Sequence, residues 1–490
     1  MPDPSTLAFG LAESLLGNRL SRALTRSYVR RRSGGRNLLE NAFLGYCGKD
    51  GHLSLGDKVR TLPLQALLEL GRFTFGVSGE EFREYLAENT SRRGFVNVLG
   101  GMADYGVTRP QILSAPFLVV WNYTNACNLR CKHCYQSAGK PTPNELTTDE
   151  CLDVIDQFHD DYVVTIAFSG GEPLLREDFY DVARYATERE IYVSVATNGT
   201  QLTKSNLNRL ADSGVGYLQI SLDAADPKVH DTFRGVPGCW AKTVQGIKNA
   251  VEDGRFYTSI ATTITTDNYF QFRDVVELSK KLKVRRLLIY NFIPTGRGEE
   301  IMKLDIPPED REELMRQEFR ELSQGFEVMT TAPQFARVCM MESETGPISL
   351  AHVGSVPGAR GRIRALAEYI GGCGAGRMYC ALQPDGTVTP CVFMPIPVGN
   401  VRNEKFIDIW RKSPVMQKLR SRDNLWGHCA TCSYKRVCGG CRARAWAYFG
   451  DLNAPDVGCI FNKKHWDECR EAQGRIVLQT KPEVELKQLL

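Results

Sequence analysis

The feature that most constrains the fold of this chain is a series of short apolar runs that alternate with helical patterns. The runs are rich in β-branched and aromatic residues and predict strands at Phe117–Tyr123, Val163–Phe168, Tyr192–Thr197, Tyr217–Leu222, Thr258–Ile264 and Arg286–Phe292. Amphipathic stretches between them predict helices near residues 149–159, 177–188, 203–212, 241–252 and 269–282. The six β/α repeats predict an α/β fold with a parallel sheet, either open or curled into a partial (β/α)6 TIM-like barrel.

The remaining sequence suggests further regions on both sides of this series. The predicted regions are a helical N-terminal extension (1–115), the partial barrel (116–298), a linker (299–370), a loop-rich cysteine region (371–470) and a C-terminal tail (471–490). In the extension, Ser78 and Glu81 form a capping-box pattern, which predicts a helix that runs to about Glu88.

Composition excludes several classes of protein. The 490 residues are 42% hydrophobic and 24% charged, as in ordinary soluble globular proteins, so disordered and collagen-like classes are excluded. Apolar stretches such as Pro116–Trp121 fall far short of the about 20 residues that a membrane-spanning helix needs. The pattern of a secretory signal peptide is not recognised at the N-terminus. The 16 cysteines therefore favour metal ligation over disulfides, and we expect a cytoplasmic protein.

The first forty residues hold the whole excess of positive charge. Seven arginines against three acidic residues give +4, which equals the net charge of the whole protein, so a general nucleic-acid surface is not supported. Here Leu16, Leu20, Leu24 and Tyr28 recur every four residues beside Arg19, Arg22 and Arg26, and Gly34–Gly35 ends the pattern. Such a basic amphipathic helix either lies in a membrane interface, at the inner face, or packs on the catalytic domain. The sequence leaves both alternatives open.

The first cysteine cluster follows the first predicted strand. It reads Cys127-Asn-Leu-Arg-Cys131-Lys-His-Cys134, a C-x3-C-x2-C pattern. Three thiolates on one short loop can bind three irons of a [4Fe–4S] cluster and leave the fourth iron open. The loop lies at the C-terminal end of a strand, where β/α barrels carry their active sites. The alternative is a zinc knuckle in which His133 is the fourth ligand.

This motif resembles that of the radical S-adenosylmethionine (radical SAM) superfamily, and further segments match the superfamily in order. The matching residues are His133, Gly170, Gly171, Glu172, Pro173, Thr197, Asn198, Ser221, Asp223 and Arg234. By this resemblance, His133 lies beside the adenine and the Gly170–Pro173 segment binds the methionyl amino group. Thr197, Asn198, Ser221 and Asp223 contact the ribose and methionine, and Arg234 pairs with the methionyl carboxylate.

The resemblance implies the chemistry of the superfamily. A reduced cluster on Cys127, Cys131 and Cys134 passes one electron to the sulfonium of S-adenosylmethionine, and the resulting 5′-deoxyadenosyl radical takes a hydrogen atom from an unactivated C–H bond. A reductant such as ferredoxin or flavodoxin supplies the electron. An iron–sulfur electron carrier or a zinc scaffold is the non-enzymatic alternative, although neither explains the matching segments beyond the cysteines.

The second cysteine group resembles the SPASM extension of radical SAM enzymes, which holds two auxiliary [4Fe–4S] clusters. By that resemblance the first binds Cys373, Cys380, Cys391 and Cys441, and the second binds Cys429, Cys432, Cys438 and Cys459, which makes three clusters in all. Gly439-Gly440 is shorter than the usual spacing, and Cys380 is not invariably a ligand, so the first auxiliary cluster can have an open iron. Two structural zinc ions are the alternative.

The sequence supports three classes of substrate. A membrane lipid is placed first, because the extension and the segment that ends at Cys127 resemble archaeal radical SAM proteins that join isoprenoid lipids. A side chain of a peptide or protein is second, because such side chains are the commonest substrates of SPASM enzymes. A tetrapyrrole is third, because Cys438–Ala445 and Gly450-Asp451 are similar to segments of haem-pathway radical SAM enzymes.

Overall fold

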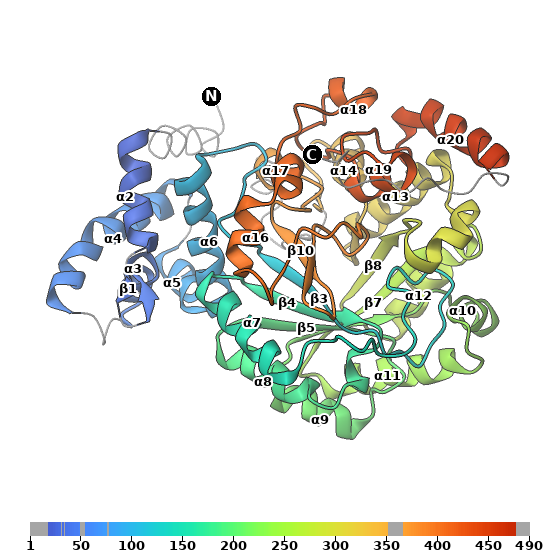
Figure 1. The fold of residues 1–490 in the computed structure, drawn as a ribbon, viewed down its shortest axis with the longest axis horizontal. Coiled ribbons are helices and arrows are strands. Elements are labelled where there is room, and N and C mark those ends of the chain that lie inside the picture. The colour runs from blue at the N-terminus through green and yellow to red at the C-terminus, as the bar shows by residue number, and fades with distance from the viewer. Residues whose placement is uncertain are drawn as a thin grey trace.

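The computed structural model describes residues 18–30, 32–33, 35–49, 54–75, 78–350 and 366–476. Its centre is a curved sheet whose strand order is β12-β11-β10-β3-β4-β5-β6-β7-β8-β9 (Figure 1). The six predicted strands are β3 (Leu118–Thr124), β4 (Thr165–Gly170), β5 (Tyr192–Thr197), β6 (Tyr217–Ser221), β7 (Tyr257–Ile264) and β8 (Arg286–Asn291). Neighbours in this series are parallel, so the predicted partial barrel is confirmed.

The five predicted helices lie between these strands and cover the outside of the sheet (Figure 1). They are α7 (Thr148–Asp160), α8 (Phe179–Glu188), α9 (Lys204–Asp212), α11 (Cys239–Asp253) and α12 (Phe272–Lys281). An additional helix, α10 (Pro227–Arg234), follows β6. Its N-cap is Asp226, whose carboxylate accepts a hydrogen bond from the Val229 amide.

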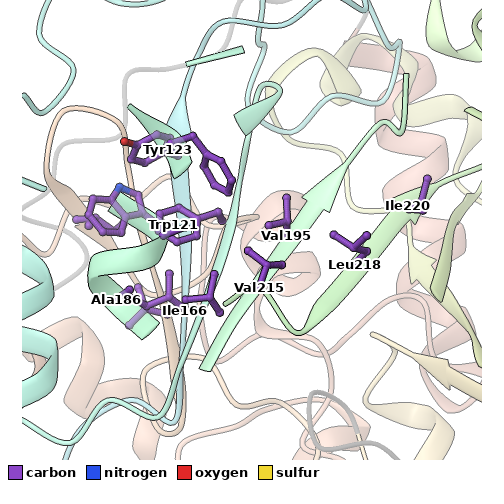
Figure 2. Close-up of a cluster of buried hydrophobic side chains, with 14 of the residues drawn as sticks. Trp121, Tyr123, Ile166, Ala186, Val195, Val215, Leu218 and Ile220 are labelled. Carbon is purple, nitrogen blue, oxygen red and sulfur yellow. The ribbon is translucent and has the colours of Figure 1, made fainter. Parts of the chain in front are cut away.

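Alternation along the strands separates the core from the interior of the barrel. On β3, Trp121 and Tyr123 point outward into an aromatic core, where the Trp121 ring stacks on Phe168 at 5.5 Å (Figure 2). Leu118 and Val120 on the same strand point inward and line a cavity. Side chains alternate between the two faces of a strand. The position of each apolar run in the sequence therefore determines which side chains point into the barrel.

The interval expected to be a linker contributes to the sheet. After α13 (Pro308–Ser323), strand β9 (Glu327–Thr330) pairs in parallel with β8, and α14 (Gln334–Glu342) follows. The sequence prediction missed β9 because four residues are too short for a period-2 pattern to be distinguished. The description of residues 299–370 as a linker is therefore wrong for the segment up to α14.

The cysteine region extends the same sheet from its other end. Strand β10 (Tyr379–Leu382) pairs in parallel with β3, and β11 (Thr387–Thr389) and β12 (Gly399–Asn400) continue in antiparallel pairs. Short helices follow: α16 (Phe406–Lys412), α17 (Pro414–Arg420), α18 (His428–Thr431), α19 (Arg442–Phe449) and α20 (Lys463–Ile476). The barrel and the cysteine region thus share one sheet.

The N-terminal extension is a group of helices beside the barrel (Figure 1). A short hairpin of β1 (Arg32–Ser33) and β2 (Arg36–Asn37) follows α2 (Arg19–Arg30), and then come α3 (Leu38–Tyr46), α4 (Leu55–Phe75), α5 (Gly79–Ala87) and α6 (Asn89–Tyr105). The capping box of Ser78 and Glu81 is confirmed at the start of α5. None of the helices among the described residues has the length and apolar character needed to cross a bilayer.

Helix α2 packs through its arginines, and its leucines point away from the protein. Leu20 and Leu24 are exposed, whereas Arg22 and Arg26 point toward the protein and bind carbonyl oxygens near the C-terminus of α6. Four carbonyl groups at a helix C-terminus lack intrahelical partners, and a guanidinium satisfies them well. Leu16, which belongs to the predicted stripe, lies outside the described residues.

Candidate active site

A cavity of about 630 Å³ fills the interior of the barrel. At the C-terminal ends of the strands it is lined by Cys127, Cys131 and Cys134. At the opposite end it reaches Glu88 and Thr90, near the start of α6. Its volume falls within the range of small-molecule sites, and its position is that of active sites in β/α barrels.

The three cysteines of the first loop lie together and have donors directed at their sulfur atoms. The Sγ of Cys127 accepts a bond from the Leu129 amide and that of Cys134 one from the Ala138 amide, both at 3.4 Å. Burial raises the pKa of the Cys127 thiol to about 11, and a bound cation would favour its thiolate form. This donor set fits an iron–sulfur cluster.

Gly170 and Gly171 line the cavity, yet close packing of the backbone already requires them to be glycines. A Cβ on Gly171 would lie 2.0 Å from the Ala126 carbonyl oxygen, and one on Gly170, whose φ is +109°, would lie 2.7 Å from that of Thr124. The two glycines therefore let the end of β4 pack against the end of β3. Pro173 is buried in the short helix that follows.

Glu172 is fully buried and binds the turn after β5. Its carboxylate accepts bonds from the Thr197 hydroxyl at 2.9 Å, the Asn198 amide at 2.8 Å and the Leu174 amide at 3.3 Å. The carboxylate thus holds Thr197 and Asn198 at the edge of the cavity, which both of them line, and its contact with the methionyl ammonium stays a prediction. The Asn198 carboxamide also binds Asn128 in the cysteine loop at 2.8 Å.

Asp223, Arg234 and His133 form a buried group beside Cys131. Arg234 donates through Nε to Asp223 at 2.5 Å and through Nη1 to the Cys131 sulfur at 3.6 Å. Asp223 therefore orients Arg234, a role that the sequence did not indicate, while Arg234 and Ser221 line the cavity. The His133 ring stacks on Phe233 at 4.2 Å, and burial lowers its pKa to about 3. Its Nδ1 is buried without a protein partner, so a neutral imidazole is available to a ligand such as adenine.

Three of the four cysteines expected to bind the first auxiliary cluster lie together. Cys373, Cys391 and Cys441 pack in one cluster with Tyr379, whose hydroxyl donates to the Cys391 sulfur at 2.5 Å. Cys380 faces the opposite side of β10 and packs in the main core. Neighbouring residues of a strand point to opposite faces, so Tyr379 and Cys380 cannot both face this group. The expectation that Cys380 is the fourth ligand is wrong for this arrangement.

The second group is complete. Cys429, Cys432, Cys438 and Cys459 line one small cavity next to Arg337. Amide groups are directed at two of the sulfurs, from Gly440 to Cys438 at 3.3 Å and from Asn462 to Cys429 at 3.4 Å. The donor set fits a four-thiolate cluster.

Comparisons with known proteins agree with this geometry. Residues 121–279 match the radical SAM superfamily, and residues 373–433 match the SPASM iron–sulfur cluster-binding domain. The AdoMet-dependent heme synthase of Nitratidesulfovibrio vulgaris is 34% identical over 72% of this protein and 94% of its own length. The chain belongs to the radical SAM/SPASM enzymes.

Other members of this family show similar relationships. The mycofactocin maturase MftC of Mycobacterium ulcerans is 31% identical to this enzyme, over 71% of the sequence of this enzyme and 89% of the sequence of the maturase. The fold of Streptococcus suis SuiB bound to S-adenosylmethionine matches with a TM-score of 0.60 at 19% identity, over 86% of this enzyme and 92% of SuiB. This enzyme therefore uses S-adenosylmethionine and iron–sulfur clusters, and the non-enzymatic alternatives are wrong.

The sequence interpretation missed an aromatic group that connects the barrel to the SPASM region. Phe393 packs edge-on against Tyr135 at 5.1 Å and Tyr290 at 6.3 Å between ring centroids. All three rings line the cavity. Tyr135 directly follows Cys134, which could have indicated it, whereas no pattern in the sequence marks Phe393.

Cys239 lies near the radical SAM loop, and its place in the sequence after the strand predicted at Tyr217–Leu222 makes it a candidate donor of a hydrogen atom to a product radical. It packs with Leu129 and Cys131, and its thiol donates to Asp231 at 3.2 Å. Asp231 also accepts the Gly238 and Trp240 amides at the start of α11. The thiol is thus part of a helix cap, and its role as a hydrogen donor stays a prediction.

Replacement of Glu172 by glutamine is expected to change how stability depends on pH. Burial raises the pKa of Glu172 to about 7, above the about 4.3 of the unfolded state. The folded state holds this proton more tightly, so the free energy of unfolding falls between about pH 4.3 and 7, by at most about 1.4 kcal/mol per pH unit. The difference in thermal midpoint between wild type and Glu172→Gln should therefore change between pH 5 and 8. A constant difference would contradict the raised pKa.

Proposed function

We propose that this radical SAM/SPASM enzyme modifies a tetrapyrrole by removing a hydrogen atom from a C–H bond of a ring substituent. The observation that carries the proposal is the 34% identity to a heme synthase over 94% of that protein's length. The cavity supports it, because the rings of Tyr135, Tyr290 and Phe393 present aromatic surface that suits a flat conjugated ligand.

The residues of the site have separate tasks in this proposal. Cys127, Cys131 and Cys134 hold the cluster that, with S-adenosylmethionine bound, supplies the one-electron chemistry that removes the hydrogen atom. Asp223 holds Arg234, which would pair with the methionyl carboxylate, and the neutral His133 would be available to the adenine. The barrel wall excludes water from the reacting C–H bond.

In this proposal the auxiliary sites take part in electron transfer. We assign one cluster to Cys373, Cys391 and Cys441, with a fourth position open to a ligand other than Cys380. A second cluster lies on Cys429, Cys432, Cys438 and Cys459. These cysteines would hold clusters that supply electron transfer to or from the site, and a ferredoxin or flavodoxin would be the reductant.

A peptide is the second candidate substrate, supported by the 31% identity to a mycofactocin maturase. A membrane lipid, which the sequence placed first, has no support in the relatives described above. Carbon–carbon crosslinking of isoprenoid lipids stays a prediction that the same experiment addresses.

The test measures 5′-deoxyadenosine formed by the anaerobically reconstituted and reduced enzyme. Assays contain no addition, iron coproporphyrin III, a peptide extract or a total membrane-lipid extract. We expect marked stimulation by the iron porphyrin, with a product whose mass shows loss of hydrogen or of a fragment of a ring substituent. Stimulation by peptide or lipid alone would overturn the tetrapyrrole assignment in favour of that class.

A further inference from the structure

Helix α2 presents leucines to solvent. Leu20 is 85% exposed and Leu24 is 58% exposed. These residues are four apart, so they form one stripe along the helix. Val59 and Leu62 on α4 are also more than half exposed. We call these four residues the apolar face of the extension.

The arginines of α2 explain why the leucines point outward. Arg22 donates to the Asp104 carbonyl at 2.7 Å, and Arg26 donates to the Ala103 carbonyl at 2.7 Å. Positions 22 and 26 lie about 200° around the helix from positions 20 and 24. Anchoring the arginines on α6 therefore forces the leucines away from the protein. The exposure is a consequence of a specific set of contacts.

The two helices that carry the apolar face are joined to each other. The Tyr28 hydroxyl on α2 donates to the Arg60 carbonyl on α4 at 2.8 Å. Tyr28 is one turn beyond Leu24, while Val59 and Leu62 flank Arg60 in the sequence. The bond places the C-terminal part of α2 beside the N-terminal half of α4, which carries Val59 and Leu62.

The charge around the apolar face is positive. Helix α2 contains four arginines and no acidic residue. Of these, Arg19 and Arg30, at its two ends, are exposed. Apolar groups bordered by guanidinium groups fit the boundary between the acyl region and anionic headgroups, where long basic residues reach the phosphates. A soluble partner would need an acidic rim around an apolar centre.

We propose that the apolar face docks this enzyme on the surface of an anionic lipid bilayer. Leu20 and Leu24 enter the acyl boundary, and Arg19 and Arg30 bind headgroup phosphates. The helix lies in the interface without crossing it. The inference does not depend on the substrate, so it stands apart from the tetrapyrrole proposal.

Flotation of the reconstituted full-length enzyme with vesicles tests the proposal. Vesicles of phosphatidylcholine with 30% phosphatidylglycerol, about a third anionic, are compared with vesicles of phosphatidylcholine alone. We expect flotation with the anionic vesicles only, weakened by high salt. The double variant Leu20→Ser, Leu24→Ser should bind at least about tenfold more weakly, and so should Arg19→Glu, Arg30→Glu.

Phe270→Ser is the matched control, because Phe270 is 65% exposed on a short helix outside the extension. It should float like the wild type, and basal cleavage of S-adenosylmethionine should be unchanged in all variants. Failure of the wild type to float, or equal flotation of the leucine variant, would overturn the proposal. A dimer of the wild type in sedimentation that the leucine variant loses would instead assign the face to a second copy of the enzyme and overturn it.

Discussion

Replacement of Cys127 by alanine is expected to abolish reductive cleavage of S-adenosylmethionine. Cys127, Cys131 and Cys134 share one loop at the mouth of the cavity, and two thiolates do not replace the three that a cluster with one open iron requires. 5′-Deoxyadenosine should fall to the level of an enzyme-free sample. The electron paramagnetic resonance signal that shifts on addition of S-adenosylmethionine should disappear, while the auxiliary signals persist.

Cys380→Ala provides the matched control for this experiment. Cys380 is fully buried in the main core, away from Cys373, Cys391 and Cys441. The variant should therefore retain the iron content and the cleavage activity of the wild type, with only a loss of packing. Residual turnover by Cys127→Ala would refute the assigned role of the first loop. Loss of an auxiliary signal in Cys380→Ala would restore Cys380 as a ligand.

Replacement of Arg444 by leucine is expected to cause the largest loss of stability. Arg444 is fully buried between Asp305 and Asp456, at 3.5 Å from each carboxylate. It also donates to the Phe292 carbonyl at 2.5 Å, which ties the SPASM region to the end of β8. Removing one member of a buried ionic group leaves the others without compensation, at a cost of about 3–5 kcal/mol.

Scanning calorimetry measures this loss, and Arg320→Leu is its control. Arg320 is more than half exposed and lies 3.3 Å from Glu313 on the same helix, where an ion pair contributes about 0–1 kcal/mol. Arg444→Leu should lower the unfolding midpoint by many degrees and release auxiliary-cluster iron at lower temperature. Equal shifts in the two variants would show that the buried group does not stabilise the junction.

The sequence was sufficient to predict the barrel, because its strands are long enough to show a recognisable pattern of apolar residues. All six predicted strands appear within about two residues of their expected bounds. Strand β9 was missed because four residues carry little periodic signal. The order of the motif segments along the sequence likewise predicted which strand ends meet, since parallel strands bring their carboxyl ends to one edge.

The direction in which a side chain points was harder to predict than the place of its residue in the fold. Whether Tyr379 or Cys380 faces the auxiliary site depends on how β10 pairs with β3, and a shift of one residue would exchange them. The sequence likewise does not show that Glu172 accepts hydrogen bonds from Leu174, Thr197 and Asn198. The arginines of α2 bind carbonyl groups at the end of α6 that lack helical partners. These hydrogen bonds orient α2, although they leave two leucines exposed.

The pairing of β10 with β3 also has a consequence for synthesis of the protein. Asn122 on β3 bonds to Gln383 just after β10, 261 residues later in the sequence. At translation rates of about 5–20 residues per second, the edge of β3 waits roughly 13 to 50 s for its neighbour. An unpaired strand edge is a template for aggregation. Coexpression with chaperones that shield exposed strand edges should therefore increase the yield of folded enzyme.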